Sequence, residues 1–188
     1  MRIISWKPPD ANLWHQAGLR QAPKALSPAG MVNDVLDRPA SGRIADGEHR
    51  FPLRVYFEDT DLSGVVYHAN YLRFMERARS DMLQGAGIDQ RAAHEDGTGT
   101  YAIANLAIRY RAPARLNDDL LVLSSVLDTK AASCVIHQRV MRGAVLLADA
   151  EIVAAFLSPE GRPRRQPSAW LDAFRRLQGP AQRGRTTE

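Results

Sequence analysis

Residues 56–71 read Tyr-Phe-Glu-Asp-Thr-Asp-Leu-Ser-Gly-Val-Val-Tyr-His-Ala-Asn-Tyr, and they join the end of an expected strand to the start of an expected helix. An acidic loop that ends at Asp61, and then Gly64, lie between the two elements. A carboxylate beside the free backbone N–H groups of a helix start suits acyl transfer, because these groups polarise a carbonyl while the carboxylate attacks it or activates water. The same residues also suit a loop that only caps the helix, with Asn70 as its N-cap. Spacing alone leaves both interpretations open.

A single long helix is expected over residues 70–85. Its apolar residues recur at helical spacing, and its charged residues fall largely on the other side. Glycines at 85 and 87 provide an end to the helix. The apolar positions are Tyr71, Leu72, Met75, Ala78, Met82 and Leu83.

Five runs of residues read as strands: 54–57, 101–111, 120–127, 133–142 and 144–157. Gly143 between the last two runs predicts a tight hairpin. One helix covers only part of one face of a sheet, so the sheet must curl around it. Arginine and histidine on the other faces indicate that a partner subunit buries part of the remainder. The pattern therefore predicts the α+β class, with one mainly antiparallel sheet.

The two ends of the chain differ from its middle. Residues 1–48 are punctuated by proline and lack periodicity, so we expect an irregular or disordered extension before a domain at 49–158. Residues 159–188 hold seven of the 25 basic residues and three of the 21 acidic ones, which leaves the rest of the chain without net charge. This basic tail either forms a short helix over residues 170–174 that docks on the domain, or stays mobile and attracts an acidic partner such as acyl carrier protein or lipid headgroups. A folded body without net positive charge argues against nucleic-acid binding.

Several classes of protein are excluded by what the sequence lacks. It has no apolar stretch of the roughly 18 residues that a membrane span needs and no signal-peptide pattern, so a cytoplasmic location is expected. The lone cysteine, Cys134, lies in an apolar run and is expected to be a buried structural thiol. We find no spacing of Asp, Glu or His typical of a metal site and no nucleotide-binding glycine motif. Catalysis is therefore expected to need no metal and no cofactor.

Four segments resemble a known family: residues 55–61, 64–71, 76–79 (Glu-Arg-Ala-Arg) and 110–116 (Tyr-Arg-Ala-Pro-Ala-Arg-Leu). They are similar to the acyl-CoA thioesterases related to 4-hydroxybenzoyl-CoA thioesterase, and especially to the bacterial branch associated with the Tol–Pal system. The resemblance covers roughly residues 50–160. It implies a hotdog fold, in which a five-stranded sheet wraps around the helix at 70–85. It also implies a homodimer paired edge to edge, or a homotetramer of two such dimers.

The resemblance further implies hydrolysis of acyl-CoA to a free acid and CoA. Asp61 matches the catalytic carboxylate of the family, which acts as a nucleophile through a mixed anhydride or as a general base for water. The backbone N–H near His68 is expected to bind the thioester oxygen, and the His68 side chain to orient water or the thioester. Glu58 and Asp59 are interpreted as loop residues. Expected substrate contacts are Gly64, Val66, Tyr67 and Asn70, together with Arg111 and Arg115 for the phosphates of CoA.

Three other functions compete with hydrolysis. A hydratase of the same fold places its Asp and His five residues apart, whereas Asp61 and His68 are seven apart. A non-catalytic module that binds acyl-CoA or acyl carrier protein gains little from a buried carboxylate near a thioester. A nucleic-acid binder would need an aromatic platform or a basic body. The acyl preference, and CoA or acyl carrier protein as the carrier, are not readable from the sequence.

Overall fold

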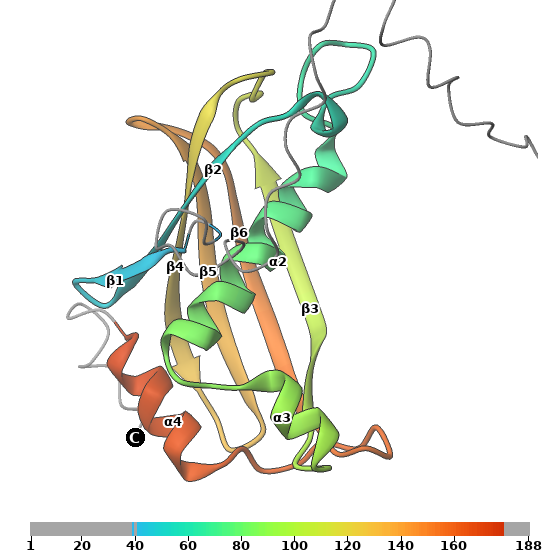
Figure 1. Cartoon of the computed structure of the whole chain (residues 1–188), viewed down its shortest axis with the longest axis vertical. Helices are drawn as coiled ribbons and strands as arrows, with labels where there is room; N and C mark the ends of the chain where they lie inside the picture. Colours follow the sequence, from blue (N-terminus) through green and yellow to red (C-terminus); the bar gives the residue numbers. More distant parts are fainter. Residues whose placement is uncertain (1–38, 40, 179–188) are drawn as a thin grey trace, which may run out of the picture. The chain divides into compact units, whose positions relative to one another are not determined.

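The computed structural model describes residues 39 and 41–178, in which one long helix lies across the concave face of an antiparallel sheet (Figure 1). The sheet has six strands in the order β1-β2-β4-β5-β6-β3, and every neighbouring pair is antiparallel. The strands are β1 (Arg43–Ala45), β2 (Glu48–Arg54), β3 (Thr100–Tyr110), β4 (Asp119–Thr129), β5 (Ser133–Arg142) and β6 (Val145–Leu157). The helices are η3 (Phe57–Asp59), α2 (His68–Gly85), α3 (Gln90–Glu95) and α4 (Ser168–Arg176).

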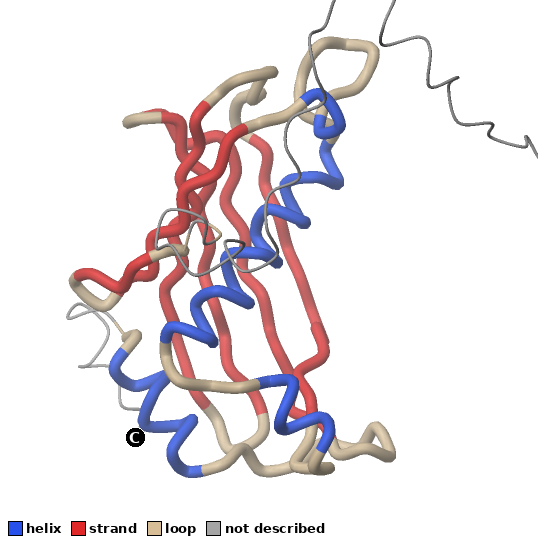
Figure 2. The backbone as a smooth tube through the Cα atoms, viewed as in Figure 1, coloured by secondary structure: helices blue, strands red, loops and turns tan. Residues whose placement is uncertain are grey.

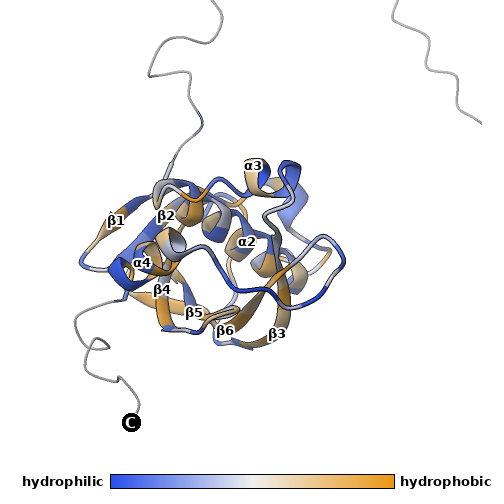
Figure 3. Ribbon diagram, turned by 90° about the horizontal axis from the view of Figure 1, so that it is seen from below, coloured by the Kyte–Doolittle hydropathy of each residue, from blue (hydrophilic) through white to orange (hydrophobic). Residues whose placement is uncertain are grey.

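The long helix α2 is held to the sheet by apolar side chains, most of them at the positions that the periodicity predicted; Phe74 is an addition to that set, and Leu72 is only partly buried. Phe74, Met75, Ala78 and Met82 are completely buried against the sheet. Burial of a side chain of this kind contributes about 1.5–3 kcal/mol, so α2 is fixed chiefly by packing. Viewed from below, the strands form an arc around α2 (Figure 3). The expected α+β arrangement, a sheet wrapped around one long helix, is confirmed.

The start of α2 differs from the expectation. The helix begins at His68 with Tyr67 as the N-cap residue, so Asn70 lies inside the first turn and does not cap it. The amide of Asn70 donates to the Tyr67 carbonyl at 2.8 Å. The N-cap assignment was therefore wrong, because the helix begins two residues before the expected range 70–85.

The N-terminal side of the sheet also differs. The strand expected at 54–57 ends at Arg54 as β2, and residues 57–59 form the short helix η3. The additional strand β1 and the first residue of β2, Glu48, lie inside the stretch expected to be irregular, so the sheet has six strands where five were expected. Asp81 of α2 anchors this edge through the Gly42 amide at 2.8 Å and His49 Nε2 at 2.7 Å. The rest of that stretch, residues 1–38 and 40, lies outside the described residues.

The C-terminal segment packs onto the lower end of the sheet (Figure 2). A helix is observed as α4, which buries Leu171, Ala173 and Phe174. Leu177 follows the helix, is 1% exposed, and accepts a hydrogen bond at its carbonyl from the Val126 amide of β4. Residues 168–177 are thus part of the folded body and not of a separate tail.

Two further expectations agree with the structure: the hairpin at Gly143 and the burial of Cys134. β5 and β6 form the expected hairpin, and Gly143 in its turn has a positive φ of 57°, which glycine adopts without strain. Cys134 is free and 2% exposed, and burial raises the pKa of its thiol to about 12.

No helix within residues 41–178 combines the length and the apolar character needed to cross a membrane.

Candidate active site

Asp61 lies at the start of a tight loop between η3 and α2. The Asp61 amide donates to the Val65 carbonyl at 3.1 Å, and the Gly64 amide donates back to the Asp61 carbonyl at 3.0 Å. Gly64 has a φ of 73°, a left-handed conformation that a residue with a side chain adopts only at a cost. The loop therefore holds Asp61 at a fixed place on the surface, with an exposed carboxylate.

Among the described residues, the carboxylate of Asp61 accepts hydrogen bonds on one oxygen only. Oδ1 accepts the Ser63 hydroxyl at 2.5 Å and the Ser63 amide at 2.8 Å. These hydrogen bonds lower the pKa of Asp61, and the charge of His68 lowers it slightly further. Because both effects stabilise the charged form, Asp61 is ionised at neutral pH. An ionised aspartate with one uncommitted oxygen suits a nucleophile or a general base, and not a general acid.

Asp59 and Asn70 connect this loop to the first turn of α2. The backbone carbonyl of Asp59 accepts both the Tyr67 amide and Asn70 Nδ2, each at 2.9 Å. The Asp59 carboxylate turns inward and accepts the Tyr56 amide at 2.9 Å. Asp59 and Asn70 are both buried, which fits a structural role for Asp59 and removes Asn70 from the surface where a substrate would lie.

The first amides of α2 point out of the helix without a partner. No backbone hydrogen bond is made by the His68 or Ala69 amide within the described part of the chain, as is usual for the first turn of a helix. The Tyr67 amide donates to the Asp59 carbonyl at 2.9 Å and Thr60 forms a bridge with Val66, so the loop of Asp61 lies beside this turn. Two free amides beside an ionised carboxylate form the arrangement that polarises a carbonyl for attack.

Aromatic side chains surround the helix start. The ring of His68 lies 4.3 Å from that of Tyr67 and 6.4 Å from that of Tyr110, measured between centroids. Tyr110, at the end of β3, donates its hydroxyl hydrogen to the His68 carbonyl at 3.1 Å. An open hollow of about 300 Å³ lies beside them, lined by Val66, His68, Tyr71, Tyr110, Arg111, Ala112 and Pro113. The hollow joins expected substrate contacts from the motif segments 64–71 and 110–116, namely Val66 and Arg111.

The two candidate arginines differ in their surroundings. Arg111 lines the hollow and forms an ion pair with Asp149, Nε to Oδ1 at 3.0 Å. Arg115 is exposed, and its backbone forms a bridge with Val65 in the loop that follows Asp61. Arg111 therefore lies in the hollow with its charge partly balanced by Asp149, whereas Arg115 is placed beside the Asp61 loop by its backbone alone.

Sequence reasoning missed Tyr110 as a member of this site. Its signal was present, because Tyr110 is the first residue of the motif segment 110–116, but that segment was interpreted through its arginines alone. The sequence could not indicate that the Asp59 carbonyl accepts hydrogen bonds from Tyr67 and Asn70, because every residue type has the same backbone carbonyl.

Comparisons with known proteins agree with this geometry. The family model described as the thioesterase-like superfamily matches residues 55–176. The acyl-CoA thioesterase YbgC of Haemophilus influenzae is 41% identical over 112 residues, which are 60% of this chain and 82% of that protein. The acyl-CoA thioester hydrolase YbgC of Escherichia coli O157:H7 is 36% identical over 128 residues, or 67% and 95% of the two chains. The crystal structure of a probable thioesterase from Bartonella henselae superposes with a TM-score of 0.61 at 33% identity, covering 64% of this chain and 99% of that one. The chain therefore belongs to the thioesterase-like superfamily.

Proposed function

We propose that the protein hydrolyses acyl-CoA thioesters to a free acid and CoA, with Asp61 as the catalytic carboxylate. The observation that carries the proposal is the juxtaposition of an ionised, exposed Asp61 with the unpartnered amides of His68 and Ala69. The relatives with 36–41% identity are named acyl-CoA thioesterases or thioester hydrolases, which supports the same reaction here.

Two routes through Asp61 fit this arrangement. As a general base, Oδ2 takes a proton from water, the hydroxide adds to the thioester carbon, and the amides of His68 and Ala69 hold the oxyanion. The C–S bond then breaks and the CoA thiolate takes the proton from Asp61. As a nucleophile, Oδ2 adds to the carbon and expels the thiolate, and water hydrolyses the resulting mixed anhydride to restore the carboxylate.

The substrate contacts follow from the hollow beside the helix start. Val66 and Arg111 line it, Tyr67 precedes His68 at its edge, and Gly64 shapes the loop that presents Asp61. Arg111 and Arg115 are proposed to bind the phosphates of CoA. His68 orients water or the thioester. Asn70 is reassigned from substrate binding to support of the loop, because its side chain is buried against Asp59.

Two copies of the chain are proposed to pair through β3. Within the sheet β3 is bound on one side only, by β6, so its other edge presents unpaired N–H and C=O groups. Ile103 and Tyr110 on this strand are each 45% exposed, and Leu62 and Phe57 near Asp61 are exposed as well. A homodimer would cover these side chains, and a homotetramer would join two such dimers. Light scattering after size-exclusion chromatography measures the state directly.

The first test is release of free thiol from short, medium, long and aromatic acyl-CoAs by the wild type and Asp61→Asn. The variant should lose about a hundredfold or more in kcat/KM. It should keep its melting temperature, because Asp61 is exposed. Glu58→Gln is the matched control, since Glu58 is an exposed acid in the same segment and should matter little. Equal activity of the wild type and Asp61→Asn would refute the role of Asp61.

A single turnover in ¹⁸O-labelled water tests the anhydride route. Incorporation of the label into the peptide that contains Asp61 indicates an anhydride that water opens at the Asp61 carbonyl. Label in the released acid alone indicates that water attacks the acyl carbon, either of the thioester itself or of the anhydride. If no thioester of CoA is cleaved, the non-catalytic binding module becomes the better interpretation. Acyl carrier protein as an alternative carrier, a cytoplasmic location and membership of the Tol–Pal-associated branch stay predictions.

A further inference from the structure

Tyr71 presents a buried hydroxyl group to the hollow beside the helix start. It lies in the first turn of α2 and is only 3% exposed, yet it is one of the residues that line the hollow. Its hydroxyl oxygen accepts the Ala114 amide at 2.8 Å, and the preceding residues Ala112 and Pro113 line the same hollow. The hydroxyl is therefore fixed at the wall of the hollow by a residue of the opposite segment.

The hydrogen of this hydroxyl is left over. A tyrosine hydroxyl both accepts and donates, and within residues 41–178 the Tyr71 hydroxyl has a donor partner, the Ala114 amide, but no acceptor. Burial raises the pKa of Tyr71, so the hydroxyl keeps its hydrogen at neutral pH. A buried donor without an acceptor is unfavourable. Water fills this role in the free protein, and a ligand in the hollow takes its place by offering an acceptor.

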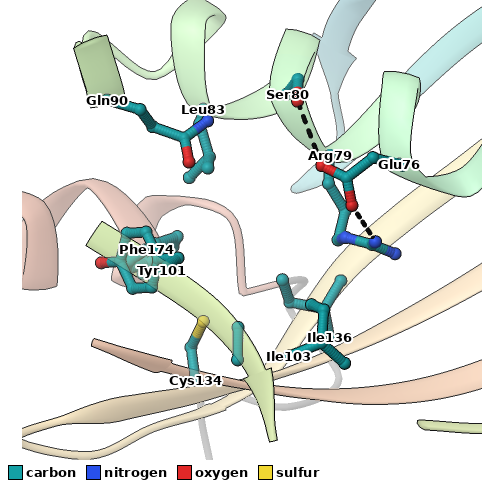
Figure 4. A pocket seen from close by; sticks show the side chains of 11 residues that line it. Glu76, Arg79, Ser80, Leu83, Gln90, Tyr101, Ile103, Cys134, Ile136 and Phe174 are labelled. Carbon is teal, nitrogen blue, oxygen red and sulfur yellow. Dashed lines mark hydrogen bonds and ion pairs between the residues drawn. The ribbon is translucent and has the colours of Figure 1, made fainter. Parts of the chain in front are cut away.

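Two other tyrosines that line cavities have already used their hydrogens. Tyr110, in the wall of the same hollow, donates to the His68 carbonyl at 3.1 Å. Tyr101 lies beside Phe174 in a separate cavity of about 80 Å³ between α2 and the sheet (Figure 4), and donates to Gln166 Oε1 at 2.5 Å. Of these three hydroxyls, only that of Tyr71 has a hydrogen to offer within the part of the chain that the structure describes.

The position of Tyr71 indicates which part of a ligand meets this hydrogen. Three helix positions separate it from His68, whose amide is proposed to hold the thioester oxygen, and this is about 4.5 Å along the helix axis. Arg111, proposed to bind phosphate, lines the same hollow. Between the thioester and the phosphates of CoA lies a flexible arm that contains amide groups. An arm that connects the two sites passes through the hollow and therefore past Tyr71.

The chemistry of the hollow favours an uncharged acceptor at Tyr71. Its hydroxyl is neutral and its neighbours in the wall, Ala112 and Pro113, are apolar, whereas an anion would be bound better by Arg111. An amide carbonyl is a strong and uncharged acceptor. The methylene groups that flank it in the arm suit the apolar wall.

We propose that the Tyr71 hydroxyl donates a hydrogen bond to the carbonyl of the amide nearest to the sulfur in the arm that carries the thioester. CoA and acyl carrier protein share this arm, so the contact serves a thioester on either carrier. It makes the arm part of what the enzyme recognises, and thioesters of simple alkanethiols become poor substrates. This inference rests on the proposed thioester hydrolysis.

The test compares kcat/KM for the butanoyl thioesters of N-acetylcysteamine, which keeps this amide, and of pentanethiol, an apolar chain of the same length. From the wild type to Tyr71→Phe the ratio of the two should fall about tenfold, the effect of one hydrogen bond between neutral groups. Loss of the Ala114 bond lowers both values alike, so an equal loss on both thioesters overturns the contact.

Tyr110→Phe is the matched control, because it removes a hydroxyl from the same hollow whose hydrogen is already donated to His68. Its ratio should equal that of the wild type, and the same fall in both variants would overturn the assignment to Tyr71. If Tyr71→Phe does not fold, the wild type alone decides. Its kcat/KM should decrease from the amide to the corresponding acetate ester and then to the pentyl chain, and equal values overturn the proposal.

Two further measurements identify the carrier and separate this proposal from hydrolysis itself. Wild-type kcat/KM for butanoyl-CoA and for butanoyl-acyl carrier protein shows which carrier supplies the arm. The better substrate should lose as much in Tyr71→Phe as the N-acetylcysteamine thioester does, and a loss no larger than that of the pentyl thioester overturns the contact. If no thioester is cleaved, calorimetry with the thioether butyl-CoA decides: affinity about tenfold weaker in Tyr71→Phe than in Tyr110→Phe supports the contact while hydrolysis alone fails, and equal affinity overturns it.

Discussion

The side-chain amide of Asn70 donates to the backbone carbonyl of Asp59 at 2.9 Å, and both residues are buried. This bond ties the first turn of α2 to the acidic loop that carries Asp61. The same carbonyl also accepts the Tyr67 amide, so one oxygen sets the position of the loop relative to the helix start. The reacting groups proposed above lie on the two segments that this oxygen joins.

Asn70→Ala should therefore reduce both stability and activity. Loss of a buried hydrogen bond that leaves its partner unsatisfied costs about 1–3 kcal/mol, and the loop that carries Asp61 loses one of its attachments. Chemical denaturation and kcat/KM measure the two effects. Gln84→Ala, on the exposed side of the same helix, is the control and should change neither. Full activity of Asn70→Ala would show that the Tyr67 amide alone is sufficient.

The pH dependence should reflect the two bonds from Ser63 to Asp61. They hold the pKa of Asp61 below its usual value, so the carboxylate stays ionised, and the enzyme active, to a lower pH than an unperturbed aspartate allows. Activity is lost as the pH falls through that pKa. Ser63→Ala removes the hydroxyl bond, so the pKa should rise and the acidic limb of kcat/KM should move to higher pH. A carbon-13 titration of the Asp61 carboxyl measures the shift independently, and an unchanged titration curve would contradict it.

The helix α4 should be necessary for a stable fold. Phe174 is completely buried beside Tyr101 and Met82, so Phe174→Ala should cost about 3–5 kcal/mol of unfolding free energy. Arg176→Ala on the exposed side of α4 is the matched control and should be nearly neutral. A drop in stability for both variants alike would argue against specific packing. A truncation after residue 157 would remove α4 together with the basic tail. The expected attraction of the tail for an acidic partner is therefore tested better by substituting Arg183 and Arg185.

The sequence indicated those parts of the fold that depend on local pattern. The period of α2 is visible because its buried residues recur every three or four positions, and Gly143 marks the last hairpin. β2 shows neither a regular apolar pattern nor a turn glycine. It contains Pro52, which is unusual in a strand, and the buried His49. Its partner β4 also follows it by more than sixty residues, so no hairpin marks the pair. The start of α2 was misplaced because the aromatic and polar residues before Asn70 do not continue the apolar pattern.

The candidate site likewise contains residues that a local pattern indicates and contacts that no local pattern indicates. Asp61 and His68 could be proposed from the sequence because their motif is contiguous, so the geometry is encoded within a few residues. The bond from Ala114 to Tyr71 joins residues 43 positions apart, and the bond from Tyr110 to His68 joins residues 42 apart. Such pairs exist only after the sheet has closed around the helix, so no local pattern reveals them.

The bond from Tyr110 to His68 has a consequence for how activity responds to protein concentration. Tyr110 belongs to the free edge of β3, and its hydroxyl holds the first carbonyl of the helix whose amides are proposed to bind the oxyanion. Association of two copies would immobilise that edge and dissociation would release it. Specific activity should therefore fall on dilution below the dissociation constant of the pair, and recover when the protein is concentrated again. By mass action, the amount of this protein in the cell would then set not only how many sites exist but what fraction of them is competent.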